Sequence, residues 1–165
     1  MLAPLQEKHL TALHRFFTNA DVRRYLWDDQ LVTTQTVADI VDASQRSFAQ
    51  AGFGFYALYQ QPRVDELIGF CGFRPFEETE DVELLYAVLP DYWGLGLVTE
   101  AARSALEHVF HNCRLERIVA ATDTPNQRSV RVMQRLGMSF DDRREFHGLD
   151  TVFYSLQRSA FIAAL

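Results

Sequence analysis

Residues 82–101 read VELLYAVLPDYWGLGLVTEA, and this stretch carries the strongest fold signal in the chain. Its first part, residues 82–89, is rich in apolar and β-branched residues, which predicts a strand. Two glycines, Gly94 and Gly96, follow, and residues 97–112 then carry apolar side chains at helical spacing. The order strand, glycine loop, helix therefore organises the middle of the chain.

The glycine loop is suited to binding an anion. Paired glycines let the backbone approach a ligand closely, and a helix start offers unpaired N–H groups at the positive end of its dipole. A pyrophosphate fits that combination. The alternative is a tight turn in which the glycines only permit chain reversal. Two other phosphate motifs are excluded, because Thr99 replaces the third glycine of the dinucleotide fold and no Gly-Lys-Ser/Thr occurs.

A second informative stretch, residues 123–138, reads DTPNQRSVRVMQRLGM. The pattern predicts a helix from near Asn126 to Leu136, which Gly137 would end. Asn126 and Ser129 lie three positions apart at its start. Both have a structural alternative, since Asn commonly begins a helix and a serine one turn later can simply face solvent.

The two stretches, in this order and at this separation, resemble the signatures of the GNAT N-acetyltransferases. Within that superfamily they look like the branch that includes the ribosomal-protein N-terminal acetyltransferases. The resemblance covers nearly the whole chain. It implies an α/β fold with a mixed, mostly antiparallel sheet, splayed strands and helices on both faces. It also implies direct transfer of an acetyl group from acetyl-CoA to a primary amine, without a metal.

The resemblance also implies a set of cofactor-binding residues. The backbone of Tyr86, Ala87 and Val88 is expected to meet the pantetheine arm as an added strand would. Asn126 is expected to contact the pantetheine as well. The glycine loop and the start of the following helix are expected to bind acetyl-CoA through Trp93, Gly94, Leu95, Gly96, Leu97, Val98 and Thr99.

An arginine stripe lies on the helix of the second stretch. Arg128, Arg131 and Arg135 follow one another at spacings of three and four, so they share one side. Such a stripe is usually a solvated face. The functional alternative is that Arg131 meets the ribose phosphate of the cofactor.

Glu83 is the first candidate for the catalytic base, because a carboxylate acting through water can deprotonate an amine. Alternation along the strand places it on one face with Leu85 and Ala87. A glutamate on this strand is also a recurrent base position in the superfamily that the chain resembles. The alternative is an exposed strand carboxylate that only pairs with a cross-strand Arg or Lys.

Two further groups are needed for acyl transfer. The oxyanion needs an N–H donor, for which Val88 or its neighbour is the candidate. The departing thiolate needs a proton or a hydrogen-bond donor. Ser129 is expected near the thioester sulfur as a catalytic residue, and Tyr154 is a weaker candidate for the proton donor.

The rest of the chain predicts a mixed sheet with helices on both faces, since strands outnumber helices and only the second half alternates. Expected helices cover 7–18, a short stretch after Asp21, 34–51, 97–112 and 126–136. Expected strands cover 53–59, 67–73, 82–89, 117–122, 138–146 and 151–156, with a strand stub at 2–5, a hairpin at 61–65 and a turn at 147–150.

Composition restricts the class of protein. The chain has 165 residues and a formal net charge of −6, which argues against general nucleic-acid or acidic-membrane binding. Its cysteines, Cys71 and Cys113, form no C-x-x-C pair and fit a reducing cytosol. No apolar run approaches 18 residues, and residues 1–4 contain no basic segment followed by an apolar one, so we expect neither a membrane span nor a signal peptide. We therefore expect one domain over residues 1–165, located in the cytoplasm.

Three function classes remain open. The first is an acetyltransferase whose acceptor is a protein N-terminal amine or a small cationic amine, which Asp28 and Asp29 could attract unless they only form a solvated loop. The second is a non-catalytic acyl-CoA-binding sensor or interaction module, favoured by Ala87, Asp91 and Leu95, which depart from the usual family residues. The third is a nucleotide-binding protein that uses the glycine loop alone. A homodimer is open in each case.

Overall fold

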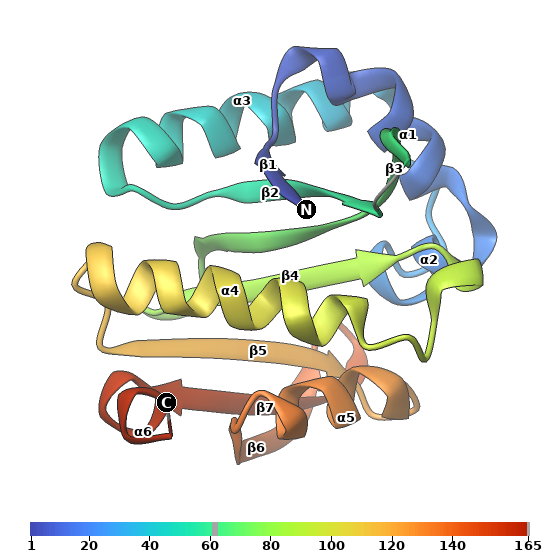
Figure 1. Ribbon diagram of the computed structural model, residues 1–165. Helices are drawn as coiled ribbons and strands as arrows, with labels where there is room; N and C mark the ends of the chain where they lie inside the picture. The colour runs from blue at the N-terminus through green and yellow to red at the C-terminus, as the bar shows by residue number, and fades with distance from the viewer. Residues whose placement is uncertain (61–62, 165) are drawn as a thin grey trace.

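The computed structural model describes residues 1–60 and 63–164, with side chains described throughout except at 63–65. Within these residues one sheet has the strand order β1-β2-β3-β4-β5-β7-β6 (Figure 1). The strands are β1 (Leu2–Pro4), β2 (Phe55–Gln60), β3 (Arg63–Pro75), β4 (Val82–Val88), β5 (Arg117–Asp123), β6 (Ser139–Phe146) and β7 (Leu149–Gln157). The helices are α1 (Leu10–Thr18), α2 (Ala20–Leu26), α3 (Thr34–Ala51), α4 (Leu97–Asn112), α5 (Gln127–Arg135) and α6 (Arg158–Ala163).

Neighbouring strands pair antiparallel except β4 and β5, which run parallel. The predicted mixed, mostly antiparallel sheet is therefore confirmed. Residues 61–62 of the hairpin predicted at 61–65 lie outside the described part of the chain, and β2 and β3 on either side pair antiparallel.

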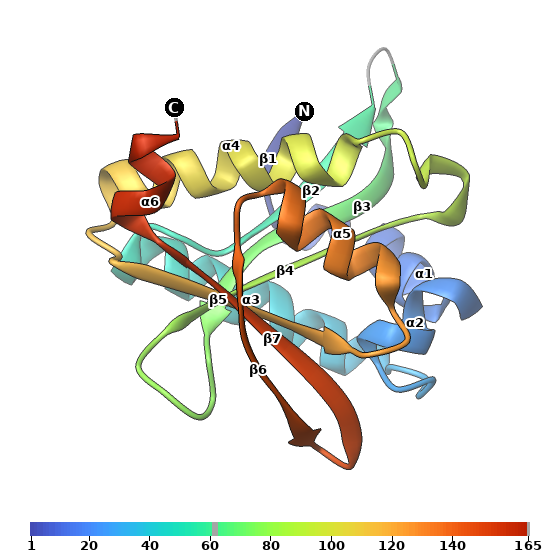
Figure 2. The same ribbon diagram turned by 90° about the horizontal axis from the view of Figure 1, so that it is seen from below.

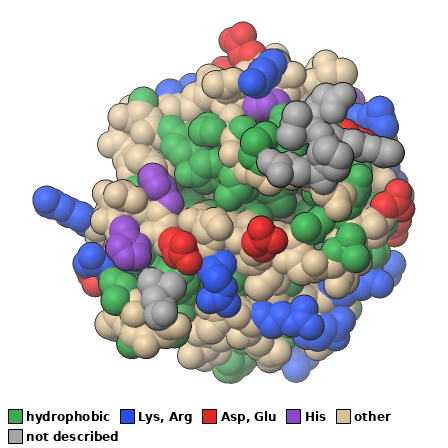
Figure 3. All heavy atoms as spheres, viewed as in Figure 1, with side chains coloured by type: hydrophobic (Ala, Val, Ile, Leu, Met, Phe, Trp, Pro, Cys, Tyr) green, Lys and Arg blue, Asp and Glu red, His purple; other side chains and the backbone are tan. Residues whose placement is uncertain are grey.

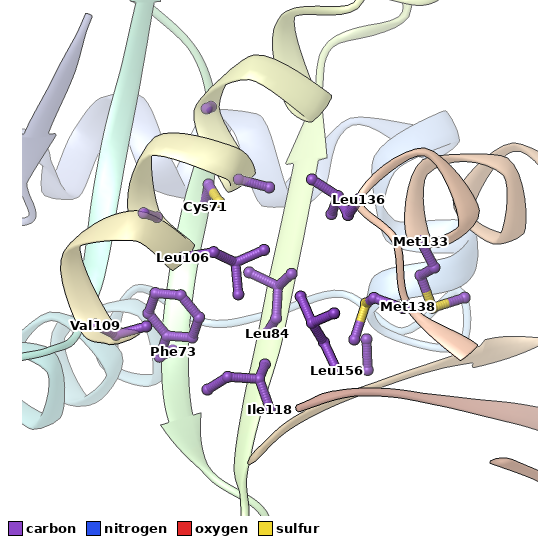
Figure 4. Packing of buried hydrophobic residues seen from close by; sticks show 14 of the residues in the cluster. Cys71, Phe73, Leu84, Leu106, Val109, Ile118, Met133, Leu136, Met138 and Leu156 are labelled. Carbon is purple, nitrogen blue, oxygen red and sulfur yellow. The ribbon is translucent and has the colours of Figure 1, made fainter. Parts of the chain in front are cut away.

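Helices cover both faces of the sheet. On one face, α1 and α3 enclose a core in which Phe16, Phe17 and Phe70 pack edge to face. On the other face, α4 lies across the centre of the sheet, and Leu106 meets the strand residues Leu84 and Ile118 in the core shown in Figure 4. Burial of these apolar faces holds the strands in the register that shapes the functional site.

The surface that carries α4 is divided by side-chain type. Figure 3 shows apolar side chains gathered between α3 and α4, whereas charged side chains lie mainly on α4 and below it. Tyr56 and Leu2 pack here as partly buried residues against the α4 core.

Two local expectations need correction. The turn expected at 147–150 contains only His147 and Gly148, because both have positive φ angles (50° and 78°) and β7 already begins at Leu149. Such a two-residue turn matches the twist of the paired strands. The helix α6 was not predicted; it buries Phe161 against Phe110 at a ring-centroid distance of 5.2 Å. Six residues are too few for a clear periodic signal.

The sheet opens between β4 and β5. Among the described residues these strands pair only at Val82 with Ile118 and at Glu83 with Val119. Beyond those pairs they diverge toward their C-terminal ends, as Figures 1 and 2 show. The splayed strands expected from the sequence are therefore present, and the gap begins directly after Glu83.

Candidate active site

A cleft of about 480 Å³ occupies the opening of the sheet. One wall is formed by β4, the glycine loop and the start of α4, and the opposite wall by the end of β5 and by α5. Residues of α2, the loop after it and the β6–β7 turn line it as well. The cleft therefore joins the two sequence stretches to segments that lie far from them along the chain.

The edge of β4 presents backbone groups to this cleft. The Leu89 N–H donates to the Ile68 carbonyl at 2.8 Å, on the side of β3. Because successive residues of a strand direct their backbone groups to opposite sides, Val88 and Tyr86 direct theirs to the cleft. Ala87, whose backbone was also expected to meet the pantetheine arm, pairs with Phe70 and directs its backbone groups to β3 instead. The Val88 carbonyl agrees with this, since it accepts the indole N–H of Trp93 at 3.0 Å. The predicted oxyanion donor thus has its N–H on the open edge.

The glycine loop has the conformation that glycine favours. Gly94 and Gly96 have φ angles of 77° and 78°, where other residues are strained. A Cβ at either position would meet no described atom within 4 Å, so the backbone and not packing requires glycine. Gly96 is also the N-cap of α4, and no described side chain caps the helix. Its first N–H groups therefore remain available to a ligand.

The other predicted residues of this segment divide into two groups. Trp93, Leu97, Val98 and Thr99 line the cleft together with the two glycines. The Leu95 side chain instead exposes 61% of its surface and lies outside the lining. Its backbone alone is in a position to contribute to binding.

The arginine stripe lies beside the cleft. Arg131 and Arg135 line it, and Arg128 places its guanidinium 4.1 Å from the centre of the Trp93 ring. This cation–π contact links α5 to the glycine loop across the mouth of the cleft. This contact of Arg128 was not predicted, because helical spacing does not show which loop a surface arginine will meet.

Asn126 and Ser129 lie together at the start of α5. The Asn126 Oδ1 accepts the Ser129 N–H at 3.3 Å, and its Nδ2 donates to Thr122 Oγ1 at 3.0 Å. The helix-start alternative is therefore observed, and both residues also line the cleft. Ser129 Oγ lies 2.9 Å from the Tyr86 hydroxyl, a contact that no local sequence pattern could indicate.

Glu83 lies where the gap in the sheet begins. Its side chain is buried, with 7% of the residue exposed, and it lines the cleft. Its Oε2 accepts a hydrogen bond from Arg74 Nε at 2.8 Å, and the two residues are cross-strand partners. Burial raises the pKa of Glu83, Arg74 lowers it and Glu77 raises it. The cross-strand arginine of the alternative is thus present, but the carboxylate is buried in the cleft and not exposed as that alternative expected.

Two carboxylates lie near each other in the lining of the cleft. Asp28 lies in the loop after α2 and Asp123 at the end of β5, and both line the cleft. Burial raises the pKa of Asp123, and the negative charge of Asp28 raises it further. Asp29 instead pairs with Arg23 at 2.8 Å. Tyr154, the weaker candidate for proton donor, lies outside the lining with its ring 5.8 Å from that of Phe140.

Comparison with known proteins identifies the family. A family model described as an acetyltransferase (GNAT) domain matches residues 1–139. The chain belongs to the GNAT acetyltransferase family. The predicted family, fold and acetyltransferase class are therefore confirmed. This GNAT acetyltransferase has, in its described residues, no helix that is both long and apolar enough to span a membrane.

Individual relatives agree with this assignment. The uncharacterized N-acetyltransferase YnaD of Bacillus subtilis is 35% identical over 138 residues, which cover 84% of this chain and 78% of YnaD. The structure of spermidine N-acetyltransferase from Vibrio cholerae, in complex with CoA and spermine, matches with a TM-score of 0.81 at 15% identity, over 98% of this chain and 97% of that one.

A second solved structure is that of RimL, a ribosomal L7/L12 alpha-N-protein acetyltransferase in complex with CoA. It has a TM-score of 0.78 at 18% identity, over 96% of this chain and 94% of that one. At these identities the two structures establish the fold of this GNAT acetyltransferase and not its acceptor.

Proposed function

We propose that this GNAT acetyltransferase transfers an acetyl group from acetyl-CoA to a primary amine, with Glu83 as the general base. One observation carries the proposal: β4 leaves β5 directly after Glu83. That separation places a buried carboxylate and an open strand edge in the same cleft. The single sheet that carries both walls supports one N-acetyltransferase domain over residues 1–165.

The residues of the donor side fit acetyl-CoA. The loop around Gly94 and Gly96 and the uncapped start of α4 suit the pyrophosphate. The open β4 edge, with Asn126 opposite, suits the amides of the pantetheine arm. Arg131 lines the cleft, and its guanidinium suits the ribose phosphate of the cofactor. When bound, acetyl-CoA supplies a thioester whose carbonyl carbon is open to attack by an amine.

The chemistry then follows from three groups of this chain. Glu83 accepts the proton of the attacking amine through water, and a raised pKa makes its carboxylate a better base near neutral pH. The Val88 N–H donates to the oxygen that becomes negative during attack. Ser129 faces the leaving sulfur. We assign no step to a metal.

The acceptor that this cleft favours is a small cationic amine. Asp28 and Asp123 give this part of the cleft negative charge, which attracts an ammonium group and disfavours an anionic acceptor. The Vibrio cholerae relative, whose structure contains spermine, shows that the fold accommodates such a molecule in another protein. A protein N-terminal amine is the competing acceptor.

Thermal unfolding of the full chain tests donor binding first. With acetyl-CoA or CoA at about a hundredfold excess over the dissociation constant, the stability should rise by about 2.7 kcal/mol and the midpoint by several degrees. ATP and NAD should leave the midpoint unchanged. A shift with ATP or NAD alone would favour the nucleotide-binding alternative, and no shift with any ligand would refute the proposal.

An amine panel then tests turnover. Release of the CoA thiol is followed with spermidine, n-butylamine, kanamycin and a short peptide with a free N-terminus. We expect the highest kcat/KM with spermidine. Turnover of the peptide alone would reassign the acceptor to a protein N-terminus. Tight binding of acetyl-CoA with no turnover of any amine would favour the sensor or interaction module.

A further inference from the structure

The Tyr86 side chain joins the two walls of the cleft. Its hydroxyl oxygen lies 2.9 Å from Ser129 Oγ and 3.1 Å from the Ser129 carbonyl oxygen. Tyr86 belongs to β4 and Ser129 to α5, and the contact lies beyond the last residue pair between β4 and β5. A direct hydrogen bond therefore replaces strand pairing at this point.

Ser129 is held from both sides. Its N–H is bound by Asn126 Oδ1 at 3.3 Å, and its carbonyl and hydroxyl oxygens both contact the Tyr86 hydroxyl. Neither its backbone nor its side chain is free to turn away from the cleft. Such restraint from two neighbouring residues is what a group with a defined role in the reaction needs.

The Tyr86 hydroxyl can donate to only one of the two Ser129 oxygens at a time, and this choice decides where the serine proton points. The Tyr86 phenol has one proton and two acceptors within reach, the carbonyl and the hydroxyl oxygen of Ser129. If Tyr86 donates to the carbonyl, the serine proton can point back to the phenol oxygen. If Tyr86 donates to Ser129 Oγ, the serine proton is released toward the cleft. A hydrogen bond received at Oγ also makes the serine a stronger donor.

We propose that Tyr86 is a positioning residue that donates to Ser129 Oγ and so directs the serine proton to the sulfur of the leaving thiolate. The inference rests on the proposed function. The amine nitrogen forms a C–N bond with the thioester carbon, the C–S bond breaks and its electron pair goes to sulfur. The proton lost by the amine reaches the thiol through Glu83 and solvent.

Tyr86 and Ser129 keep their own protons in this scheme. A thiol is more acidic than a phenol or an alcohol, so the thiolate accepts a hydrogen bond from Ser129 without taking the proton. Burial also raises the pKa of Tyr86, which keeps the phenol protonated. The pair therefore stabilises the negative charge on sulfur and does not supply the proton that neutralises it.

Tyr86→Phe removes only the hydroxyl and tests this role. The matched control is Tyr56→Phe, which deletes a partly buried tyrosine hydroxyl outside the cleft. Affinities for CoA and for desulfo-CoA, which lacks the thiol, are measured by calorimetry between about pH 7 and pH 9, where a thiol ionises. Turnover of acetyl-CoA with spermidine is measured in parallel.

We expect Tyr86→Phe to bind desulfo-CoA like the wild type but to lose the gain in CoA affinity at high pH. Its kcat should fall about fivefold to tenfold with little change in KM for acetyl-CoA, as loss of one neutral hydrogen bond predicts. In a Ser129→Ala background the same change should have no further effect on kcat. Tyr56→Phe should match the wild type.

Other outcomes are distinguishable. Equal weakening of CoA and desulfo-CoA by Tyr86→Phe would mean that Tyr86 only holds the fold of the cleft, and would overturn the inference. Unchanged kcat and unchanged pH dependence of CoA affinity would overturn it as well. If Tyr86→Phe does not fold, Ser129→Ala must show the same loss of the pH-dependent gain in CoA affinity, or the inference falls. A wild type that binds neither CoA nor desulfo-CoA would instead refute the proposed function.

Discussion

The two halves of the cleft are built in different ways. The donor half, around Gly94, Gly96 and the start of α4, comes mainly from the continuous stretch 82–101, with α5 opposite. The acceptor half combines Asp28, Glu83 and Asp123 from a loop and two strands. A continuous segment encodes its conformation locally, whereas groups that meet across a fold do not. This contrast explains why the sequence indicates the proposed donor half as a unit, whereas in the proposed acceptor half it indicates Glu83 and Asp28 separately and does not indicate Asp123.

The largest expected effect separates binding from chemistry. Glu83→Gln removes the proposed base while the donor half stays intact, so kcat/KM should fall by about 10²-fold to 10³-fold. Acetyl-CoA affinity should not change. Steady-state kinetics and calorimetry measure the two quantities. Glu66→Gln, which changes an exposed carboxylate on β3 outside the cleft, is the control. Turnover of Glu83→Gln at the wild-type rate would exclude Glu83 as the base.

A pair of glycine variants tests whether the donor half depends on its backbone conformation. Gly96→Ala and Gly148→Ala both place alanine at a φ of 78° in open space, so each should lose about 1 kcal/mol of stability. Only Gly96→Ala should also weaken acetyl-CoA binding, by roughly tenfold, because only Gly96 lies in the predicted phosphate loop. Equal acetyl-CoA affinities in the two variants would show that the glycine loop is only a turn.

The charge of the acceptor half is tested by Asp123→Asn. Loss of this carboxylate should raise KM for spermidine by about threefold to fivefold and have less effect on KM for n-butylamine, which carries one charge. The effect should shrink as salt increases. Asp42→Asn, on the exposed face of α3, makes the same change in net charge outside the cleft and should leave both KM values unchanged. Equal changes for the two amines would argue against recognition of a second cation.

The smallest expected effect concerns the pH profile. Arg74 lowers the pKa of Glu83, whereas burial raises it. In Arg74→Met the pKa of Glu83 should rise further, so less of the carboxylate is ionised at a given pH. The acidic limb of kcat/KM should therefore move to higher pH, with a loss of about twofold near neutral pH. Absence of this limb in Glu83→Gln would assign it to Glu83, and an unmoved limb in Arg74→Met would contradict the assignment.

Helices and strands were predicted well where the local pattern of apolar residues is long and regular. Residues 97–112 form α4 at the predicted bounds, because an apolar stripe along a long helix is a strong periodic signal. The short helix α6 was missed. The partner of Glu83 was predicted only as a cross-strand Arg or Lys, and the register of β3 with β4 identified it as Arg74.

The sequence by itself determined the family, the order of strands and helices around the cleft, and the glycine loop with its positive φ angles, because each depends on residues close together in the chain. The tertiary structure decided which distant groups come together: Tyr86 meets Ser129, Arg128 meets Trp93, and Asp28 and Asp123 line the same cleft. Those contacts depend on where β4 and β5 part and on how α2 and α5 pack beside the gap. Residue spacing along the chain does not predict these positions, because they result from burial of the whole apolar core.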